Sequence, residues 1–287
     1  MKKAFLISLF ALCTALCANA QFFQINFQQV PPVASPGSRQ GGVQIDGCIF
    51  QFFDGAKAVD VYSIDTKEHL QRIPLKGHKT WHCNNANVRP VEGMRFPLIY
   101  VSQENKAEHC ICVFKVSGSK GAYSLTQIQT IKLPAPVQMG VWYPNLAIDH
   151  EAGFLYITGY SRESWNDARF GNGLQIIKFA LPEPDKSVVE LSTSDILDRR
   201  VYAFRLATQG AVVRYGRLYQ VYGMGGDSSI VCYDLSNGRE IWARDLKEAG
   251  IPNEPESLFF YGEDLYCVDV KGIVYTSYGA ANRTPCL

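Results

Sequence analysis

The sequence predicts an all-β protein built as a single five-bladed β-propeller that is closed by its N-terminal strand. Between Gly41 and Gly279 the chain repeats a similar unit five times, each with a strand that opens on a polar or small residue, a short turn and further apolar strands. A strand-like segment precedes the first unit, and the last unit offers only three strands. Because a closed ring removes exposed sheet edges, we expect the N-terminal segment to complete the last blade.

The stretch from Ser228 to Leu246 shows the repeated unit most clearly. An apolar run from Ile230 to Leu235 meets the turn signal Ser236-Asn237-Gly238, and a second strand resumes at Ile241. Two strands joined by such a short Asn-Gly turn are typical of a β-hairpin.

The pattern Tyr233-Asp234-Leu235-x-x-Gly238-x-x-x-Trp242 resembles the repeat of quinoprotein-type propellers, which are related to WD-repeat blades. The resemblance implies a blade in which Trp242 fills the space between neighbouring sheets. It does not extend to a quinone cofactor, because this chain has no pair of adjacent cysteines.

The first residues have the features of a secretory signal peptide. Lys2 and Lys3 precede an apolar run from Ala4 to Ala18, and Ala18-Asn19-Ala20 forms a small-x-small cleavage motif. The apolar run is too short to span a membrane, and no later segment is long enough. We therefore expect a signal peptide at residues 1–20, a propeller domain at residues 21–287, a secreted or periplasmic location and no membrane insertion.

The predicted strands follow this domain in order. Residues 21–30 alternate apolar and polar side chains, as a half-exposed strand does. The five units then cover residues 41–75, 84–133, 143–182, 208–246 and 254–279, at roughly the 40 to 50 residues expected for one blade. The polar segment 183–200 is predicted to be a linker between the third and fourth units.

Charge and cysteine content limit the partners. Lys and Arg number 28 against 27 Asp and Glu, and no basic block stands out, so nucleic acid is not an expected partner. Seven cysteines follow residue 20; Cys110 and Cys112 lie in a strand-like run and are expected to be buried thiols. A disulfide that ties Cys286 to the domain is the alternative.

The starts of the five inner strands are the predicted site. Propeller ligands usually bind at the central channel, where each innermost strand begins. Asn85 and Asn145 each stand eight residues before a turn glycine, so they should occupy equivalent places in neighbouring blades. The expected ring is Gln40, Asn85, Asn145, Gln209 and Glu256. Its amide and carboxylate oxygens would suit a divalent cation such as calcium or the hydroxyls of a sugar, or would only solvate the channel mouth.

The third unit, from Tyr143 to Tyr160, is similar to a repeat of the gluconolactonase family. In that family the propeller holds a divalent metal with a Glu, two Asn and an Asp from inner strands. The resemblance implies that Glu256, Asn145 and Asn85 are metal ligands here. Gln209 departs from the pattern, because it stands where an acidic residue is expected and cannot act as a general base.

Aromatic residues gather around the third unit and suggest a binding surface. Trp142 and Tyr143 open its inner strand, and Trp165 lies in the long loop 161–173. Aromatic rings beside amide side chains suit sugar or peptide binding, although packing in an aromatic-rich propeller core explains most such residues.

These observations favour an exported, non-catalytic binding module for a glycan, peptide or protein partner. A metal-dependent, lactonase-like hydrolase that uses the central channel is the alternative. The sequence does not identify the ligand or the oligomeric state. The cofactor is also open, and a divalent cation such as calcium is the one candidate.

Overall fold

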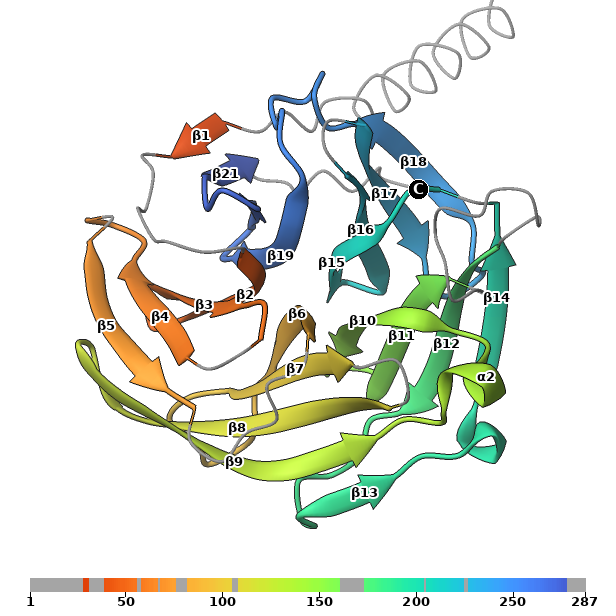
Figure 1. The fold of residues 1–287 in the computed structure, drawn as a ribbon, viewed down its shortest axis with the longest axis horizontal. Coiled ribbons are helices and arrows are strands. Elements are labelled where there is room, and N and C mark those ends of the chain that lie inside the picture. The colour runs from red at the N-terminus through yellow and green to blue at the C-terminus, as the bar shows by residue number, and fades with distance from the viewer. Residues whose placement is uncertain are drawn as a thin grey trace, which may run out of the picture.

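The computed structural model describes residues 28–30, 39–55, 58–66, 68–75, 82–104, 108–160, 173–203, 205–224 and 227–277. They form five separate sheets arranged around one axis, as Figure 1 shows. The predicted single five-bladed propeller is therefore confirmed. The predicted signal peptide, Trp165, most of the loop 161–173 and Cys286 lie outside the described residues.

Blades 1 to 3 follow one another along the chain, each with its innermost strand first. Blade 1 contains β2 (Arg39–Ile45), β3 (Cys48–Phe53), β4 (Ala58–Ser63) and β5 (His69–Pro74). Blade 2 contains β6 (His82–Arg89), β7 (Leu98–Glu104), β8 (His109–Ser119), β9 (Ala122–Lys132) and β13 (Val188–Glu190). Blade 3 contains β10 (Trp142–Asp149), β11 (Phe154–Tyr160), β12 (Leu174–Ala180) and β14 (Asp198–Tyr202).

Blades 4 and 5 complete the ring. Blade 4 contains β15 (Thr208–Arg214), β16 (Arg217–Met224), β17 (Asp227–Asp234) and β18 (Glu240–Asp245). Blade 5 contains β19 (Pro255–Tyr261), β20 (Asp264–Asp269), β21 (Val274–Ser277) and, as its outermost strand, β1 (Gln28–Val30).

The N-terminal strand β1 closes the ring as predicted. It pairs antiparallel with β21, with Gln28 opposite Thr276 and Val30 opposite Val274. The first and last parts of the chain thus share one sheet, and β1 covers the edge of β21 that would otherwise be free.

The predicted linker 183–200 is not a plain connection. It contains β13, which pairs parallel with β9, and the start of β14, the fourth strand of blade 3. A 3₁₀ turn at Thr193–Asp195 lies between them. Neither strand contains the apolar run that predicts a strand, because β13 has only three residues and β14 is a largely exposed strand that begins with Asp198, Arg199 and Arg200. A short helix α2 (Pro136–Met139) was also not predicted.

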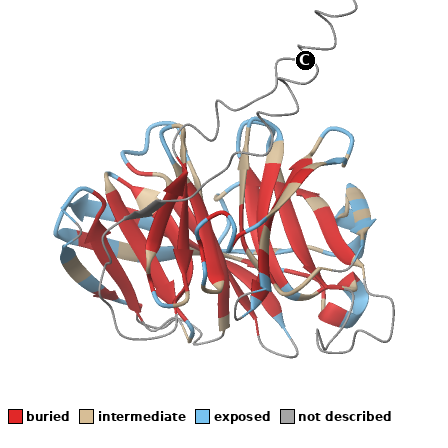
Figure 2. Ribbon diagram, turned by 90° about the horizontal axis from the view of Figure 1, so that it is seen from above, coloured by how far each residue is buried: buried red, intermediate tan, exposed pale blue. Residues whose placement is uncertain are grey.

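The core lies between the blades. Figure 2 shows the strands buried along much of their length and exposed at the turns. Trp242 is 9% exposed and packs at the contact between blades 4 and 5, with its ring centroid 6.1 Å from that of Tyr219, as predicted for a residue that fills space between sheets. The described cysteines are buried, as predicted for Cys110 and Cys112; they are Cys48, Cys83, Cys110, Cys112, Cys232 and Cys267.

Candidate functional site

Each inner strand carries a register irregularity close to where it begins. In blade 1, Gln40 and Gly41 together stand opposite Phe52 of β3. Comparable irregularities follow Cys83 in β6, Trp142 in β10, Thr208 in β15 and Pro255 in β19. Such bulges bend a strand and redirect its side chains, so the five strands present the residues of the bulges to the axis.

The residues of the predicted ring fall into two successive layers. The five inner strands can be aligned by the first residue after each bulge that faces the preceding blade. These residues are Gly42, Ala86, Leu146, Ala211 and Leu258. One residue earlier stands the inner layer: Gly41, Asn85, Asn145, Gly210 and Ser257. Two residues earlier stands the outer layer: Gln40, Asn84, Pro144, Gln209 and Glu256. Asn85 and Asn145 are thus equivalent, as predicted, whereas Gln40, Gln209 and Glu256 belong to the other layer.

Hydrogen bonds in the outer layer join one blade to the next. The Gln40 amide, oriented to match its surroundings, donates to Glu256 Oε2 at 3.2 Å and to the Cys83 carbonyl at 3.0 Å. Gln209 Nε2 donates to Glu254 Oε1 at 2.7 Å. Burial, together with Glu254, Asp269 and Asp54, raises the pKa of Glu256 well above its usual value. Burial and the neighbouring carboxylates thus disfavour the charged form of Glu256, which lies between blades 5 and 1 in contact with Gln40.

Two asparagine side chains of β6, Asn85 and Asn87, cross the axis and bind the backbone of other blades. Asn85 Nδ2 donates to the carbonyls of Leu146 at 2.7 Å and Ala211 at 3.0 Å. Asn87 Nδ2 reaches the same two carbonyls at 3.2 and 2.9 Å, and its Oδ1 accepts from the Ile148 N–H at 3.2 Å. Figure 1 shows β6 close to the centre of the ring. These bonds tie blade 2 to blades 3 and 4 across the axis.

The three residues expected to bind metal fit that role only in part. Asn85 Oδ1 and Asn145 Oδ1 are buried oxygens without a hydrogen-bond partner in the described structure, so both could act as ligands. Glu256 stands in the other layer and interacts with Gln40. Among the described residues, no three His, Cys, Asp or Glu side chains converge so that they could share a metal ion. The metal site stays a prediction.

A cavity of about 160 Å³ lies on the axis beyond Asn87, toward the ends of the inner strands. Each blade contributes at least one apolar residue to its walls, and these residues include Val43, Val88, Ile148, Val212 and Phe259. Asn87 lines it, and the exposed residues Pro90 and His150 also border it, so the cavity communicates with the surface. We call this space the axial cavity.

Arg214 supplies a polar group at the axial cavity. Its Nε is buried and has no hydrogen-bond partner among the described residues. Its Nη2 donates to Tyr215 Oη and Glu263 Oε1, both at 3.3 Å, which fixes the guanidinium. A mostly apolar space that is bordered by a guanidinium suits an apolar group that carries an acceptor oxygen.

The predicted aromatic residues lie at the other end of β10. Trp142 pairs with Tyr160, and Tyr143 is 37% exposed with a φ of 55°, a left-handed conformation that is uncommon for a tyrosine. The structure does not bring Trp142 or Tyr143 to the axial cavity, which the last residues of β10 border. Sequence reasoning missed the wall residues because alternating apolar residues near a strand end look like ordinary core.

A buried acid and a buried imidazole lie at the end of the β7–β8 hairpin. His109 Nε2 is 3.6 Å from Glu104 Oε2. Burial raises the pKa of Glu104 to about 8, against hydrogen bonds from Asn84 and the Tyr143 backbone. Burial lowers the pKa of His109 to about 4. Both groups are neutral near pH 7, so this contact is not an ion pair.

No helix among the described residues is long and apolar enough to cross a membrane.

No protein-family model and no curated protein matches the chain. Among solved structures, it is similar to luciferin-regenerating enzyme at 12% identity, with 87% of this chain and 94% of that chain covered and a TM-score of 0.52. It is also similar to Myxococcus xanthus glutaminyl cyclase at 11% identity, with the same coverage and a TM-score of 0.53. At such identities the likeness concerns the fold alone. The chain is a β-propeller, a scaffold on which binding sites are built.

Proposed function

We propose that this protein is an exported, non-catalytic binding module that holds a peptide or protein partner by an apolar side chain inserted into the axial cavity. The observation that carries the proposal is the cavity wall, to which all five inner strands contribute apolar residues. An apolar cavity of about 150 Å³ holds a benzene-sized group, so this one matches a single leucine or aromatic side chain.

The partner class follows from the chemistry of the cavity. Apolar walls offer little to the hydroxyls of a glycan, which would lose hydrogen bonds to water on entry. A peptide presents an apolar side chain next to backbone carbonyls, and the guanidinium of Arg214, which borders the cavity, can donate to such an oxygen. Among the three partner classes expected from the sequence, these features favour a peptide or a protein.

The experiment is the selection of a displayed peptide library against the chain that begins at Gln21. Selected peptides are expected to share one large apolar anchor residue. Val212→Phe fills the cavity and should weaken binding at least tenfold, and the milder Val212→Leu serves if the larger ring disturbs folding. Val137→Phe is the matched control, because Val137 is 79% exposed on α2.

Two results would overturn the proposal. One is a set of selected peptides without a shared apolar residue. The other is equal affinity of the parent and the correctly folded Val212 variants. Export is tested separately, by sequencing the N-terminus of the mature protein, which should begin at Gln21.

The metal-dependent hydrolase stays an alternative hypothesis. Its support is the resemblance of the third unit and the two unpartnered oxygens of Asn85 and Asn145.

A further inference from the structure

We infer that a groove between blades 3 and 4 is a second binding site, for a neutral saccharide. The groove has a volume of about 410 Å³, within the range of small-molecule sites. It shares no lining residue with the axial cavity and includes the turn after β10, the start of β16 and the end of β17. The inference does not depend on the proposed peptide site.

Aromatic rings and balanced charges line this groove. Phe154, Tyr156 and Tyr215 supply rings, and Lys178 lies over the Phe154 ring at 3.4 Å. The charged groups are two carboxylates, Asp149 and Asp234, and two cations, Lys178 and Arg217. Rings pack against the apolar face of a sugar, while carboxylates accept from hydroxyls and cations donate to them. Since the charges balance, a neutral ligand is favoured over an anion.

Tyr215 is the residue that singles out the groove. It is 54% exposed, and with Gly216 it forms the two-residue turn between β15 and β16, with φ angles of 51° and 67°. Both positions of such a turn need a left-handed backbone, which favours Asn, Asp or Gly. The corresponding turn of blade 1 uses Asp46 and Gly47, with φ angles of 55° and 68°. Tyr215 therefore makes this turn less stable than Asn, Asp or Gly would, and its ring is exposed to solvent.

The ring of Tyr215 is held in place although it is exposed. Its hydroxyl donates to Glu263 Oε1 at 3.1 Å and accepts from Arg214. The Arg214 guanidinium lies 4.8 Å from the ring centroid. A fixed, exposed ring beside carboxylates and cations is preorganised to stack on a ligand, because little conformational freedom is lost on binding.

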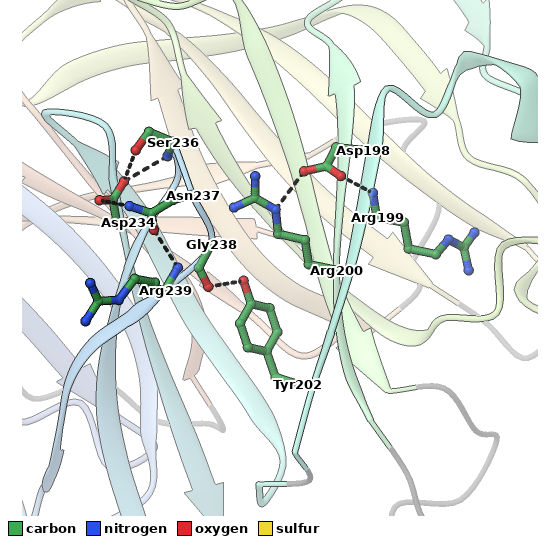
Figure 3. Close-up of polar contacts among 9 residues, drawn as sticks. All are labelled: Asp198, Arg199, Arg200, Tyr202, Asp234, Ser236, Asn237, Gly238 and Arg239. Atoms are coloured by element: carbon green, nitrogen blue, oxygen red, sulfur yellow. Dashed lines mark hydrogen bonds and ion pairs between the residues drawn. The ribbon is translucent and has the colours of Figure 1, made fainter.

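The neighbouring part of the same wall, at the end of β17, is also rigid. Asp234 accepts from Ser236 N at 2.9 Å, Ser236 Oγ at 2.6 Å and Asn237 Nδ2 at 2.8 Å. Tyr202 Oη of blade 3 donates to the Gly238 carbonyl at 2.9 Å and fastens this turn to the neighbouring blade, as Figure 3 shows.

The test compares Tyr215→Asn with the parent on an array of neutral and acidic oligosaccharides, followed by calorimetric titration of the best-bound neutral one. Asn suits the turn better than Tyr, so the variant should be at least as stable to heat, and a loss of binding cannot be ascribed to unfolding. Binding should weaken at least tenfold. Tyr261→Ser is the control, since Tyr261 is 39% exposed at the end of β19 in blade 5 and does not line the groove, and this variant should bind like the parent.

Three results would overturn the inference: a parent that binds no neutral saccharide, a parent that binds only acidic ones, or a Tyr215→Asn variant with the affinity of the parent.

Discussion

Gln51 of blade 1 and Gln220 of blade 4 occupy the same position and make the same hydrogen bonds. Each amide nitrogen donates to the two carbonyls of the bulge in the inner strand of its blade. It also donates to the carbonyl of the residue that follows the glutamine. For Gln51 these are Gln40 O at 3.0 Å, Gly41 O at 3.1 Å and Phe52 O at 3.0 Å. For Gln220 they are Gln209 O at 2.7 Å, Gly210 O at 3.2 Å and Val221 O at 3.1 Å.

These glutamines stabilise the bulges that shape the axis. Gln220→Ala would leave buried carbonyls without a donor and the Thr158 hydroxyl without its acceptor. Each buried group left unpaired costs about 1–3 kcal/mol, so the free energy of unfolding should fall by about 3 kcal/mol. Urea denaturation measures it. Gln127→Ala, at an exposed position, should change it by less than about 0.5 kcal/mol, and an equally small change for Gln220→Ala would contradict the role given to the amide.

Closure by β1 predicts that deleting residues 22–30 destabilises the whole domain. The deletion removes the partner of β21 and leaves the edge of blade 5 free. We expect a clearly lower melting temperature by calorimetry and more aggregation on heating. An unchanged melting temperature would show that the ladder between Gln28 and Thr276 contributes nothing to closure.

The buried Glu104 predicts that stability falls between pH 6.5 and 8. Its pKa rises from 4.5 to about 8 on folding, so over that interval the folded state binds the proton more tightly and the free energy of unfolding falls as pH rises. His109, whose pKa falls from 6.5 to about 4, acts in the opposite direction below pH 6.5 and offsets the effect there. The loss from Glu104 therefore becomes visible above pH 6.5.

Glu104→Gln should remove this loss, because the amide oxygen can still accept from Asn84. Relative to the parent, the variant should gain stability from pH 6.5 to 8, by at most about 1.4 kcal/mol per pH unit. Glu183→Gln, at an exposed carboxylate, controls for the same chemical change. A constant difference between Glu104→Gln and the parent over this range would refute a buried neutral acid.

The burial of Glu256, which raises its pKa, and its contact with Gln40 predict that divalent cations do not stabilise the protein. A ligand that binds only the folded state at a hundred times its Kd adds about 2.7 kcal/mol to the free energy of unfolding. With Glu256 held by Gln40 in a different layer from Asn85 and Asn145, calcium or zinc should not raise the melting temperature. A rise that Glu256→Gln abolishes would instead establish a metal site and favour the hydrolase hypothesis.

The five repeated units could be predicted from the sequence, but the layers in which residues lie at the axis could not. The spacing of Asn85 and Asn145 from their turn glycines identified equivalent residues, because hairpin length is visible in the sequence. The sequence did not show to which layer Glu256 belongs, because the layer depends on the size of the bulge. In blade 1 two residues after Arg39 stand opposite one residue of β3, whereas in blade 5 a single residue lies between Pro255 and Ser257. A bulge depends on tertiary packing and leaves no distinct sequence pattern.

Outer strands and cavities were hidden for different reasons. The burial of β14 alternates along an exposed edge, so its residues resemble a polar linker. The axial cavity depends on how far side chains such as Asn87 reach across the axis, which periodicity does not encode. Residues chosen for their chemistry, such as Trp142, were therefore found at the opposite end of the strand from the cavity.

The measurement that tests the proposed function most directly is a methyl-resolved NMR titration with the selected peptide. If the peptide inserts its apolar anchor into the axial cavity, the largest shifts should occur at the methyl groups of Val43, Val88 and Ile148 on three different inner strands. The NMR signals of the Val137 methyl groups on α2 should not shift. Shifts confined to outer strands or to α2, with the three inner-strand methyl groups unchanged, would contradict binding on the axis.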